Sequence, residues 1–385
     1  METPAIVAKR LRDVRRVVVK VGTNLLRGTG EGLNLEFMDA LAQQIVELRA
    51  RGISVLLVSS GAVGAGAYAM GFDTPPTETS QRQALAAIGQ PRLMRHYKLA
   101  FGRHDVTVAQ VLLTRDSLDK RERYLNARNT FDTLFDWGIV PIANENDTIA
   151  VEELKFGDND QLSALIAGKI GADLLVLLTD VDGIYDRNPE EQGARRIPFL
   201  ALKDHGTVEI GEGGARSFGL GGMRSKLTAV RLAARAGILA FIGPGRAPNI
   251  LHRVLDGDAV GTWCEPNEQK ISARKRWLAL GKRPGEGRIR IDSGAAAALL
   301  HGGKSLLPSG VVQVSGGFGR GDLIHILGPS REEIALGLSQ YSAQELAAVQ
   351  GRRSDEIESL VGERQNFEVV HRDDMVILTG EQSDD

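Results

Sequence analysis

Two lysines stand at glycine-rich turns where a phosphate group could be held. Lys20 lies in the apolar run Arg16–Val21 just before Gly22, and Lys226 follows the segment 219–222, Gly-Leu-Gly-Gly, at the start of a helical pattern. Backbone N–H groups at glycine turns and helix N-termini bind anions because no side chain shields them. We interpret both lysines as facing phosphate. For Lys20 the alternative is a structural lysine at the sheet edge whose head reaches water.

Small and polar residues follow other apolar runs. Ser59-Ser60-Gly61-Ala62 comes after Val55–Val58, and the richest cluster, Asn144-Glu145-Asn146-Asp147, is followed by Gly157-Asp158-Asn159-Asp160. Such residues also form ordinary turns, but their amides and acids could hold an amino acid. None of the seven histidines lies in these motifs. That fits a carboxylate as nucleophile, which is ionised at neutral pH and needs no general base.

Two other motifs invite different interpretations and fail on their spacing. Gly64-x-Gly66-x-x-Ala69 matches a dinucleotide-binding fingerprint, but the required acid at a strand end about 20 residues later is replaced by the proline-containing loop Thr74–Ser80. The strand pattern Leu174–Thr179 runs into several acids that begin at Asp180. A calcium loop needs glycine at its sixth position, which here is Tyr185.

The elements that must position these motifs form an α/β pattern. Short β-branched runs alternate with turns and helical segments, which predicts an open, mainly parallel sheet with helices on both faces. Ligands of such sheets bind at the carboxyl ends of the strands. A helix is expected at Leu35–Arg51. The expected strands are Arg16–Val21, Ser54–Ser60, Val106–Leu113, Ile139–Ala143, Leu174–Thr179 and Ile238–Ile242.

A second, β-rich domain is expected after the Gly- and Pro-containing stretch Gly281–Gly287. We divide the chain into a first domain at 1–262, a linker at 263–285, a small domain at 286–379 and an acidic tail at 380–385. The pattern of the small domain is one helix and short strands with close turns. The helix is expected at Ala295–His301, and the strands at Arg288–Ile291, Val311–Val314, Leu323–Leu327 and Glu368–Val370.

The amino-acid composition narrows the class of protein to which the chain can belong. With 42% hydrophobic and 25% charged residues, no long apolar run and a single cysteine, Cys264, the chain is expected to be a cytoplasmic globular protein without a membrane span. Residues 1–283 carry 38 Lys+Arg and 33 Asp+Glu, a balance of +5, whereas residues 284–385 carry 9 and 16, a balance of −7. The acidic second part makes nucleic acid an improbable ligand.

Together these motifs resemble the glutamate 5-kinases of the amino-acid kinase family, which carry a C-terminal PUA domain. The resemblance covers nearly the whole chain, and its motifs are far more specific together than singly. In the first domain they are the Lys20 turn, Ser59-Ser60-Gly61-Ala62, Asn144-Glu145-Asn146-Asp147, Gly157-Asp158-Asn159-Asp160, Thr179-Asp180 and Gly222-Met223-x-Ser225-Lys226. In the second they are Asp292-x-Gly294-Ala295, Ser305-Leu306-Leu307-Pro308-x-Gly310, Gly319-Arg320-Gly321-Asp322 and His371-Arg372-Asp373-Asp374.

The resemblance implies an amino-acid kinase fold and ATP-dependent phosphorylation of the glutamate side-chain carboxylate, the first step of proline biosynthesis. It implies that Ser60, Asp147 and Asn159 bind glutamate and that Asp160 holds the catalytic lysines Lys20 and Lys226 beside the transferring phosphoryl group. Mg²⁺ would accompany the nucleotide without a protein metal site. The implied ATP-binding residues are Lys20, Thr179, Asp180, Leu220, Gly221, Gly222, Met223, Arg224, Ser225 and Lys226. Leu220 departs from the small polar residue that relatives often carry.

The same resemblance implies partners and leaves alternatives open. It implies glutamate and ATP as substrates, proline as a feedback inhibitor, glutamate-5-semialdehyde dehydrogenase as a partner enzyme, and a homo-oligomer. One alternative is another carboxylate kinase of the superfamily. The other is an RNA-associated protein, because PUA domains elsewhere bind RNA, although the acid excess of residues 284–385 argues against it.

Overall fold

A computed structural model of the chain describes residues 4–28, 32–114, 117–118, 121–150, 159–187, 189, 191–202, 222–258, 260–266, 287–352 and 368–378. The chain forms two compact units, residues 1–269 and 270–385. Within the described ranges, no helix has the length and apolar character that a membrane crossing requires.

The larger unit is built on an eight-stranded sheet with the order β3-β4-β2-β1-β5-β9-β10-β8. All neighbouring strands are parallel except β9 and β10, which pair antiparallel. A separate hairpin joins β6 (Ile184–Tyr185) to β7 (Arg196–Ile197). The strands of the sheet are β1 (Arg16–Val21), β2 (Ser54–Ser59), β3 (Val108–Leu113), β4 (Val140–Glu145), β5 (Leu174–Thr179), β8 (Phe199–Leu202), β9 (Leu239–Pro244) and β10 (Thr262–Pro266).

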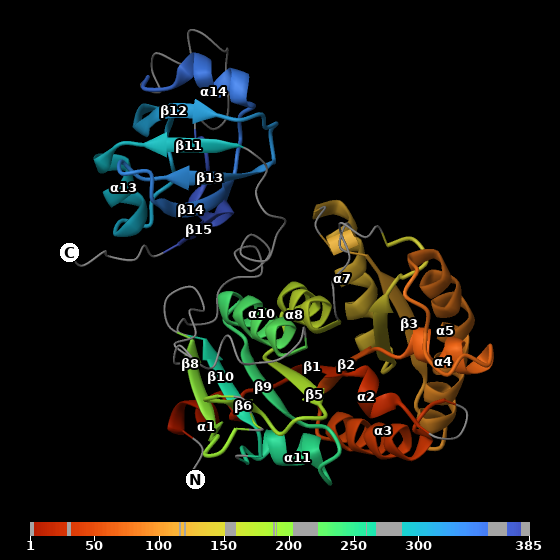
Figure 1. Ribbon diagram of the computed structural model, residues 1–385. Helices are drawn as coiled ribbons and strands as arrows, with labels where there is room; N and C mark the ends of the chain where they lie inside the picture. The colour runs from red at the N-terminus through yellow and green to blue at the C-terminus, as the bar shows by residue number, and fades with distance from the viewer. Residues whose placement is uncertain are drawn as a thin grey trace. The chain divides into compact units, whose positions relative to one another are not determined.

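Helices cover both faces of this sheet, which confirms the predicted fold class. In Figure 1, α7, α8 and α10 lie on one side, and α3 and α11 on the other. The helices of this unit are α1 (Ala5–Arg12), α2 (Thr23–Leu26), α3 (Leu35–Ala50), α4 (Ala62–Ala69), α5 (Thr79–Gly102), α7 (Arg121–Asp136), α8 (Asn159–Ile170), α10 (Gly222–Arg235) and α11 (Ile250–Leu255).

The alternation of side chains along β1 decides where Lys20 lies. Val17, Val19 and Val21 pack in one hydrophobic core together with residues of α3 and α5. Because successive side chains of a strand point to opposite faces, Val18 and Lys20 face the other side, which is the side of α8 and α10. The lysine is 2% exposed, so its charge requires a partner on that side.

Helices α4 and α5 pack unusually closely through two glycines. A Cβ at Gly66 would lie 1.9 Å from the carbonyl oxygen of Leu85, and one at Gly89 would lie 1.8 Å from the carbonyl oxygen of Ala62. No side chain fits at either position, so the two helices form one rigid hairpin beside the loop that follows β2.

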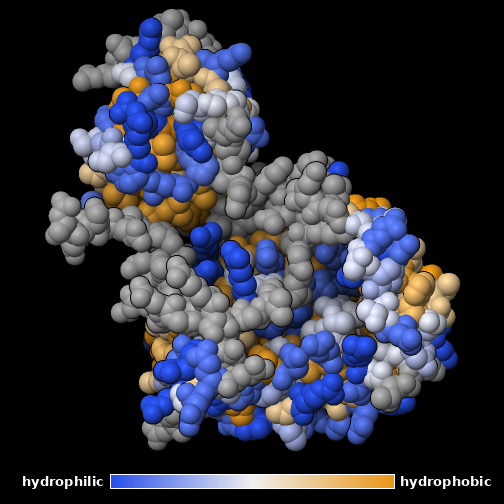
Figure 2. Space-filling model, in the orientation of Figure 1, coloured by the Kyte–Doolittle hydropathy of each residue, from blue (hydrophilic) through white to orange (hydrophobic). Residues whose placement is uncertain are grey.

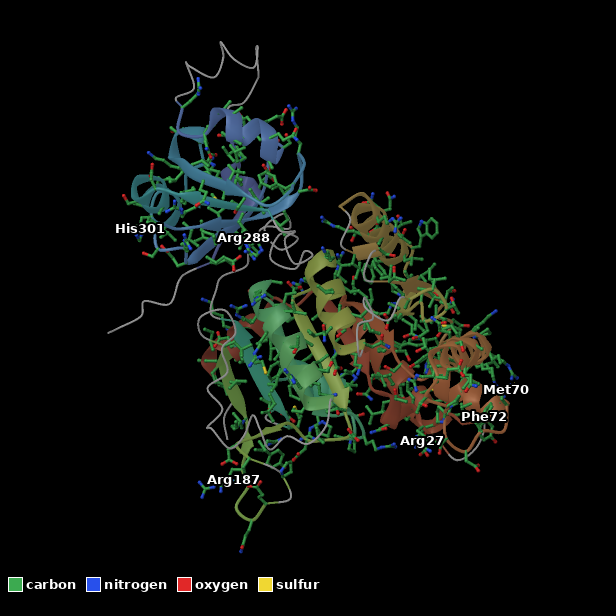
Figure 3. All side chains as sticks on the ribbon, turned by 45° about the horizontal axis from the view of Figure 1, so that its top comes forward. Arg27, Met70, Phe72, Arg187, Arg288 and His301 are labelled. Atoms are coloured by element: carbon green, nitrogen blue, oxygen red, sulfur yellow. The ribbon has the colours of Figure 1, made fainter. Side chains whose placement is uncertain are left out.

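The far end of α4 exposes apolar side chains. Met70 is 56% exposed and Phe72 is 48% exposed, and Figure 3 shows both at the same end of the larger unit. Pale and orange surface gathers over α4 and α5 in Figure 2, whereas much of the remaining described surface of this unit in that view is blue.

The smaller unit has its own sheet and core. Five strands lie in the order β12-β11-β13-β14-β15, and a separate hydrophobic cluster centred on Ile289, Ile324 and Tyr341 fills its interior. The elements are β11 (Arg288–Ile291), α13 (Ser293–Leu300), a 3-10 turn at Pro308–Gly310, β12 (Val311–Ser315), β13 (Leu323–Leu327), β14 (Glu333–Leu338), α14 (Ala343–Val349), a second 3-10 turn at Arg372–Asp374 and β15 (Met375–Ile377).

Several details differ from the sequence expectations. The small unit contains a second helix, α14, where one helix was expected. Glu368–Val370 is no strand, because Val370 forms only an isolated bridge with Leu306, and β15 is the segment that pairs with β14. Strand β10 continues in the large sheet to Pro266, into the stretch assigned to the linker. The domain bounds at 262, 285 and 379 remain predictions, and Gly281 and the tail 380–385 lie outside the described residues.

Candidate active site

The carboxyl ends of adjacent strands bring most of the predicted site residues together. Lys20 is the penultimate residue of β1, Ser60 directly follows β2, and Thr179 ends β5. Asn159 and Asp160 form the first turn of α8. Because β2, β1 and β5 are parallel neighbours, these residues meet at one edge of the sheet, where ligands of such folds bind.

One buried carboxylate joins the two lysines. The Oδ1 atom of Asp160 lies 2.6 Å from Nζ of Lys20, and its Oδ2 atom lies 3.1 Å from Nζ of Lys226. Asp160 is fully buried, and Lys226 is 8% exposed. A Cβ at Gly22 would lie 3.8 Å from Nζ of Lys20. The lysine head therefore sits against the glycine turn, and its contact with a phosphate remains a prediction.

A cavity of about 400 Å³ lies next to this ion cluster. Ser60, Asp147 and Asn159, which the family resemblance assigns to glutamate, all line it. The other lining residues are Thr23, Gly61, Ala62, Val63, Gly64, Pro75, Arg82, Gln83, Asn144 and Glu145. Asn159 links the cavity to the ion cluster, because it immediately precedes Asp160.

A chain of amide side chains runs from the cavity into the protein. Nδ2 of Asn159 donates to Oγ of Ser60 at 3.0 Å and to Oδ1 of Asn144 at 2.8 Å. Nδ2 of Asn144 donates to Oε1 of Gln90 at 2.9 Å, and Nε2 of Gln90 donates to Oε1 of Gln110 at 3.1 Å. Because the first three amides are buried, each hydrogen bond restricts the orientation of the next.

A tyrosine fixes the loop that carries Ser60. The hydroxyl groups of Ser59 and Tyr97 are 2.8 Å apart, and Oγ of Ser59 also donates to the carbonyl oxygen of Ser60 at 3.1 Å. Burial raises the pKa of Tyr97 well above its usual value, although the hydrogen bond to Ser59 lowers it slightly. Tyr97 is therefore a neutral structural support rather than an acid or base.

A second polar group surrounds Asp180 at the end of β5. Its Oδ2 atom accepts from Nδ2 of Asn24 at 2.8 Å, and its Oδ1 atom accepts from Oγ1 of Thr179 at 3.0 Å. Burial pushes the pKa of Asp180 upward, but these hydrogen bonds and the charge of Lys226 outweigh it and lower the pKa. Asp180 is therefore an anion at neutral pH. The backbone N–H of Gly245 holds the carbonyl oxygen of Thr179 at 2.8 Å.

The predicted nucleotide segment is described only in part. Helix α10 begins at Gly222, so Met223, Arg224 and Ser225 belong to the turn that presents Lys226. Leu220 and Gly221 lie outside the described residues, and so do Gly157 and Asp158.

Some site residues were not singled out from the sequence. Asn144 and Asn24 were part of recognised motifs without separate roles, and Gln90 and Arg82 were not considered. Gln90 had a detectable signal, because a polar residue occupies an inward-facing position of a helical pattern between Leu85 and Leu93. The hydrogen bond of Asn24 to Asp180 and the position of Arg82 at the cavity depend on the folded structure and leave no such pattern.

The sole cysteine takes no part in this chemistry. Cys264 is fully buried in β10, and burial raises the pKa of its thiol to about 12. The thiol is therefore protonated at neutral pH and is a poor nucleophile.

Comparison with known proteins agrees with this geometry. Residues 15–243 match the amino acid kinase family, and residues 287–361 match the PUA domain. A glutamate 5-kinase from Citrifermentans bemidjiense is 44% identical over 96% of this chain and 99% of its own length. A glutamate 5-kinase from Nitratidesulfovibrio vulgaris is 47% identical over 96% of this chain and 97% of its own length.

A third relative gives the same result. The glutamate 5-kinase from Desulfotalea psychrophila is 46% identical over 95% of this chain and 97% of its own length. The matches extend through both units, so they include the PUA domain as well as the kinase part. The chain therefore belongs to the amino acid kinase family and, within it, to the glutamate 5-kinases.

Proposed function

We propose that the chain transfers the terminal phosphoryl group of ATP to the side-chain carboxylate of glutamate, which yields glutamyl 5-phosphate and ADP. The observation that carries this proposal is the pair Lys20 and Lys226, held by Asp160 beside a cavity with the size and polarity for an amino acid. The reaction would be the first step of proline biosynthesis, as expected of a glutamate 5-kinase.

In this proposal the reacting carboxylate lies near Ser60 and Asn159. Asn159 immediately precedes Asp160 of the ion cluster, and it donates a hydrogen bond to Ser60. One carboxylate oxygen forms a bond to the terminal phosphorus while the bond from that phosphorus to the bridging oxygen of ADP breaks. No proton is transferred, so no base is needed. The two ammonium groups stabilise negative charge on the phosphoryl oxygens, and Asp160 keeps them in position.

The nucleotide would lie on the other side of the lysines, at the end of β5 and the first turn of α10. Asp180 and Thr179 form one border of that region, and Asn24 fixes the carboxylate of Asp180. The ionised carboxylate of Asp180 suits a hydrogen bond from an adenine or ribose donor group. Met223, Arg224 and Ser225, in the first turn of α10, are the other described residues that we assign to the nucleotide.

Mg²⁺ accompanies ATP in this proposal. Within the described part of the chain, no three His, Cys, Asp or Glu side chains gather as a metal site, and Asp160 is already paired with two lysines. Mg²⁺ in nucleotide sites is commonly held by phosphate oxygens, water and few protein groups, so the described residues fit an ion carried by the nucleotide. The ion would neutralise part of the phosphate charge.

An acceptor screen tests the proposal. The full chain is incubated with ATP and Mg²⁺ and, in separate reactions, with glutamate, aspartate, acetylglutamate, carbamate or UMP. ADP release is measured, and hydroxylamine traps any acyl phosphate as a hydroxamate. We expect ADP and hydroxamate with glutamate alone. Turnover of another acceptor in place of glutamate would instead favour a different kinase of the superfamily.

The proposed pathway position extends to regulation. We expect proline to inhibit the reaction in the same assay, because the end product of a pathway often controls its first enzyme. Glutamate-5-semialdehyde dehydrogenase would consume the labile acyl phosphate, and the enzyme would act as a homo-oligomer. Inhibition curves with proline against a matched amino acid such as valine, together with light scattering of the purified chain, test these points.

A further inference from the structure

The charges around the cavity suit one particular part of the proposed substrate. Glutamate carries two carboxylates and one ammonium group, and only one carboxylate reacts. Among the described residues that line the cavity, Asp147 and Glu145 are acidic and Arg82 is the only cation. The lysines of the ion cluster do not belong to this lining. The carboxylate that does not react therefore needs a separate positive partner inside the cavity.

The lining of the cavity comes from different elements. Ser60 and Asn159, joined by a hydrogen bond of 3.0 Å, are linked to the ion cluster because Asn159 precedes Asp160. Arg82 projects from the first turn of α5, which begins at Thr79. If the side-chain carboxylate of glutamate lies beside Ser60 and Asn159, its α-carbon and the two groups attached to it extend toward other lining residues, which include Arg82 and Asp147.

The first turn of α5 is tied to the loop that carries Asp147. Nε2 of Gln83 donates to the carbonyl oxygen of Ala150 at 3.2 Å, and the backbone N–H of Ala150 donates to the carbonyl oxygen of Asn146 at 3.0 Å. Arg82 is next to Gln83, and Asp147 is next to Asn146. These hydrogen bonds therefore keep a cation and an anion on connected walls of one cavity.

Arg82 is also available for a ligand. The guanidinium groups of Arg16 and Arg253 form ion pairs with Asp132 and Asp258. In the described ranges of the chain, by contrast, Arg82 has no ion-pair partner, and its side chain is exposed at the cavity. A guanidinium fork matches the two oxygens of a carboxylate in a bidentate geometry.

We infer that Arg82 binds the α-carboxylate of the amino-acid substrate, on the cavity wall connected to Asp147, the predicted glutamate-binding acid that suits the α-ammonium group. Arg82 is then the residue that selects acceptors with a free α-carboxylate. This inference rests on the proposed function and adds a specificity-determining residue to it. Because the contact is equal in the ground state and the transition state, its loss raises KM and leaves kcat nearly unchanged.

The test compares two substrates and three enzymes. The substrates are glutamate and its α-amide, isoglutamine, which lacks only the α-carboxylate charge. For the native enzyme we expect kcat/KM for glutamate to exceed that for isoglutamine by roughly 10- to 100-fold, the range for a hydrogen bond to a charged group. In Arg82→Met we expect the glutamate KM to rise by a similar factor and the preference to fall to about threefold or less.

Arg92→Met is the matched control. Arg92 is exposed on the same helix and does not line the cavity, so its loss changes the charge of α5 without changing the substrate contact. We expect this variant to keep the native glutamate KM and the native preference. Arg82→Lys keeps the charge but loses the fork, and we expect an intermediate glutamate KM.

Specific results would overturn the inference. The inference is wrong if the Arg82→Met enzyme retains the native preference for glutamate over isoglutamine. It is also wrong if this substitution raises the KM for ATP and leaves the KM for glutamate unchanged. Failure of the proposed function itself looks different, since the native enzyme would then form no hydroxamate from glutamate.

Discussion

The ion cluster allows a prediction that separates catalysis from stability. Asp160→Asn keeps the size of the side chain and removes the charge that faces two buried ammonium groups at 2.6 and 3.1 Å. At an effective dielectric constant of about 20, opposite unit charges roughly 3 Å apart attract each other by about 5 kcal/mol. Most of that attraction offsets the cost of burying the ions, yet removal of one partner typically costs about 3–5 kcal/mol because the others stay buried.

This loss converts into measurable quantities. Unfolding entropy near 60 °C is about 2.1 cal/mol/K per residue, which gives roughly 0.57 kcal/mol/K for the 269 residues of the larger unit. We therefore expect Asp160→Asn to lower the Tm of that unit by roughly 5–9 °C. We also expect kcat to fall by about a hundredfold or more, since the lysines lose the group that positions them.

Asp173→Asn is the matched control for this substitution. The Oδ2 atom of Asp173 accepts from the backbone N–H groups of Arg15 and Arg16 at 2.8 and 3.0 Å, at the opposite end of β1 from the ion cluster. Its loss should lower Tm by a few degrees and leave kcat unchanged. Calorimetry and the hydroxamate assay are performed on both variants at the same pH. If Asp160→Asn keeps its turnover within threefold of the native value, or if its Tm does not fall, the reasoning is refuted.

Other predictions concern the same unit. Lys20→Ala and Lys226→Ala should each reduce kcat about a hundredfold with smaller changes in glutamate KM; near-native turnover in either variant would remove that lysine from the mechanism. Gln90→Leu leaves an amide of the buried chain without its acceptor and should raise glutamate KM about tenfold. The same substitution should have little further effect in an Asn159→Ala background, because both act through one network, and additive effects in that double-mutant cycle would contradict a shared path. A chain of residues 1–281 should fold and phosphorylate glutamate, because every described site residue lies within it. A folded but inactive fragment would show that the PUA part is required for catalysis, and submicromolar RNA binding by the full chain at physiological salt would revive the alternative RNA role.

The sequence was sufficient for the elements that follow simple periodicity. β1, β5, β11 and β13 have the expected bounds, and α3 ends one residue before the expected position. Each is a run of apolar residues between turn residues, so local pattern and tertiary burial agree. The strand expected at Glu368–Val370 was wrong. An apolar pair such as Val369-Val370 does not show whether a neighbouring strand will form a continuous series of backbone hydrogen bonds with it.

Only part of the candidate site followed from local patterns. Lys20 lies near the end of a strand beside a glycine turn, where parallel sheets bind ligands, whereas the roles of Ser60, Asn159 and Asp160 were implied by the family resemblance. Gln90 and Arg82 lie on a helix whose placement depends on the close contact of Gly66 with the backbone of Leu85. No local pattern encodes such a contact between residues 19 positions apart, so these side chains enter the site only once the fold is known.

The first turn of α8 couples the two halves of the proposed reaction. Asn159 binds Ser60 and Asn144 at the cavity, and the next residue, Asp160, binds both lysines. A helical turn moves as a unit, so a displacement that misplaces the amide of Asn159 also misplaces the carboxylate between the ammonium groups. Substrate contact and phosphoryl stabilisation therefore depend on one rigid element. It follows that substitutions which shift this turn change KM and kcat together, whereas substitutions at Arg82, on a different helix, change KM alone.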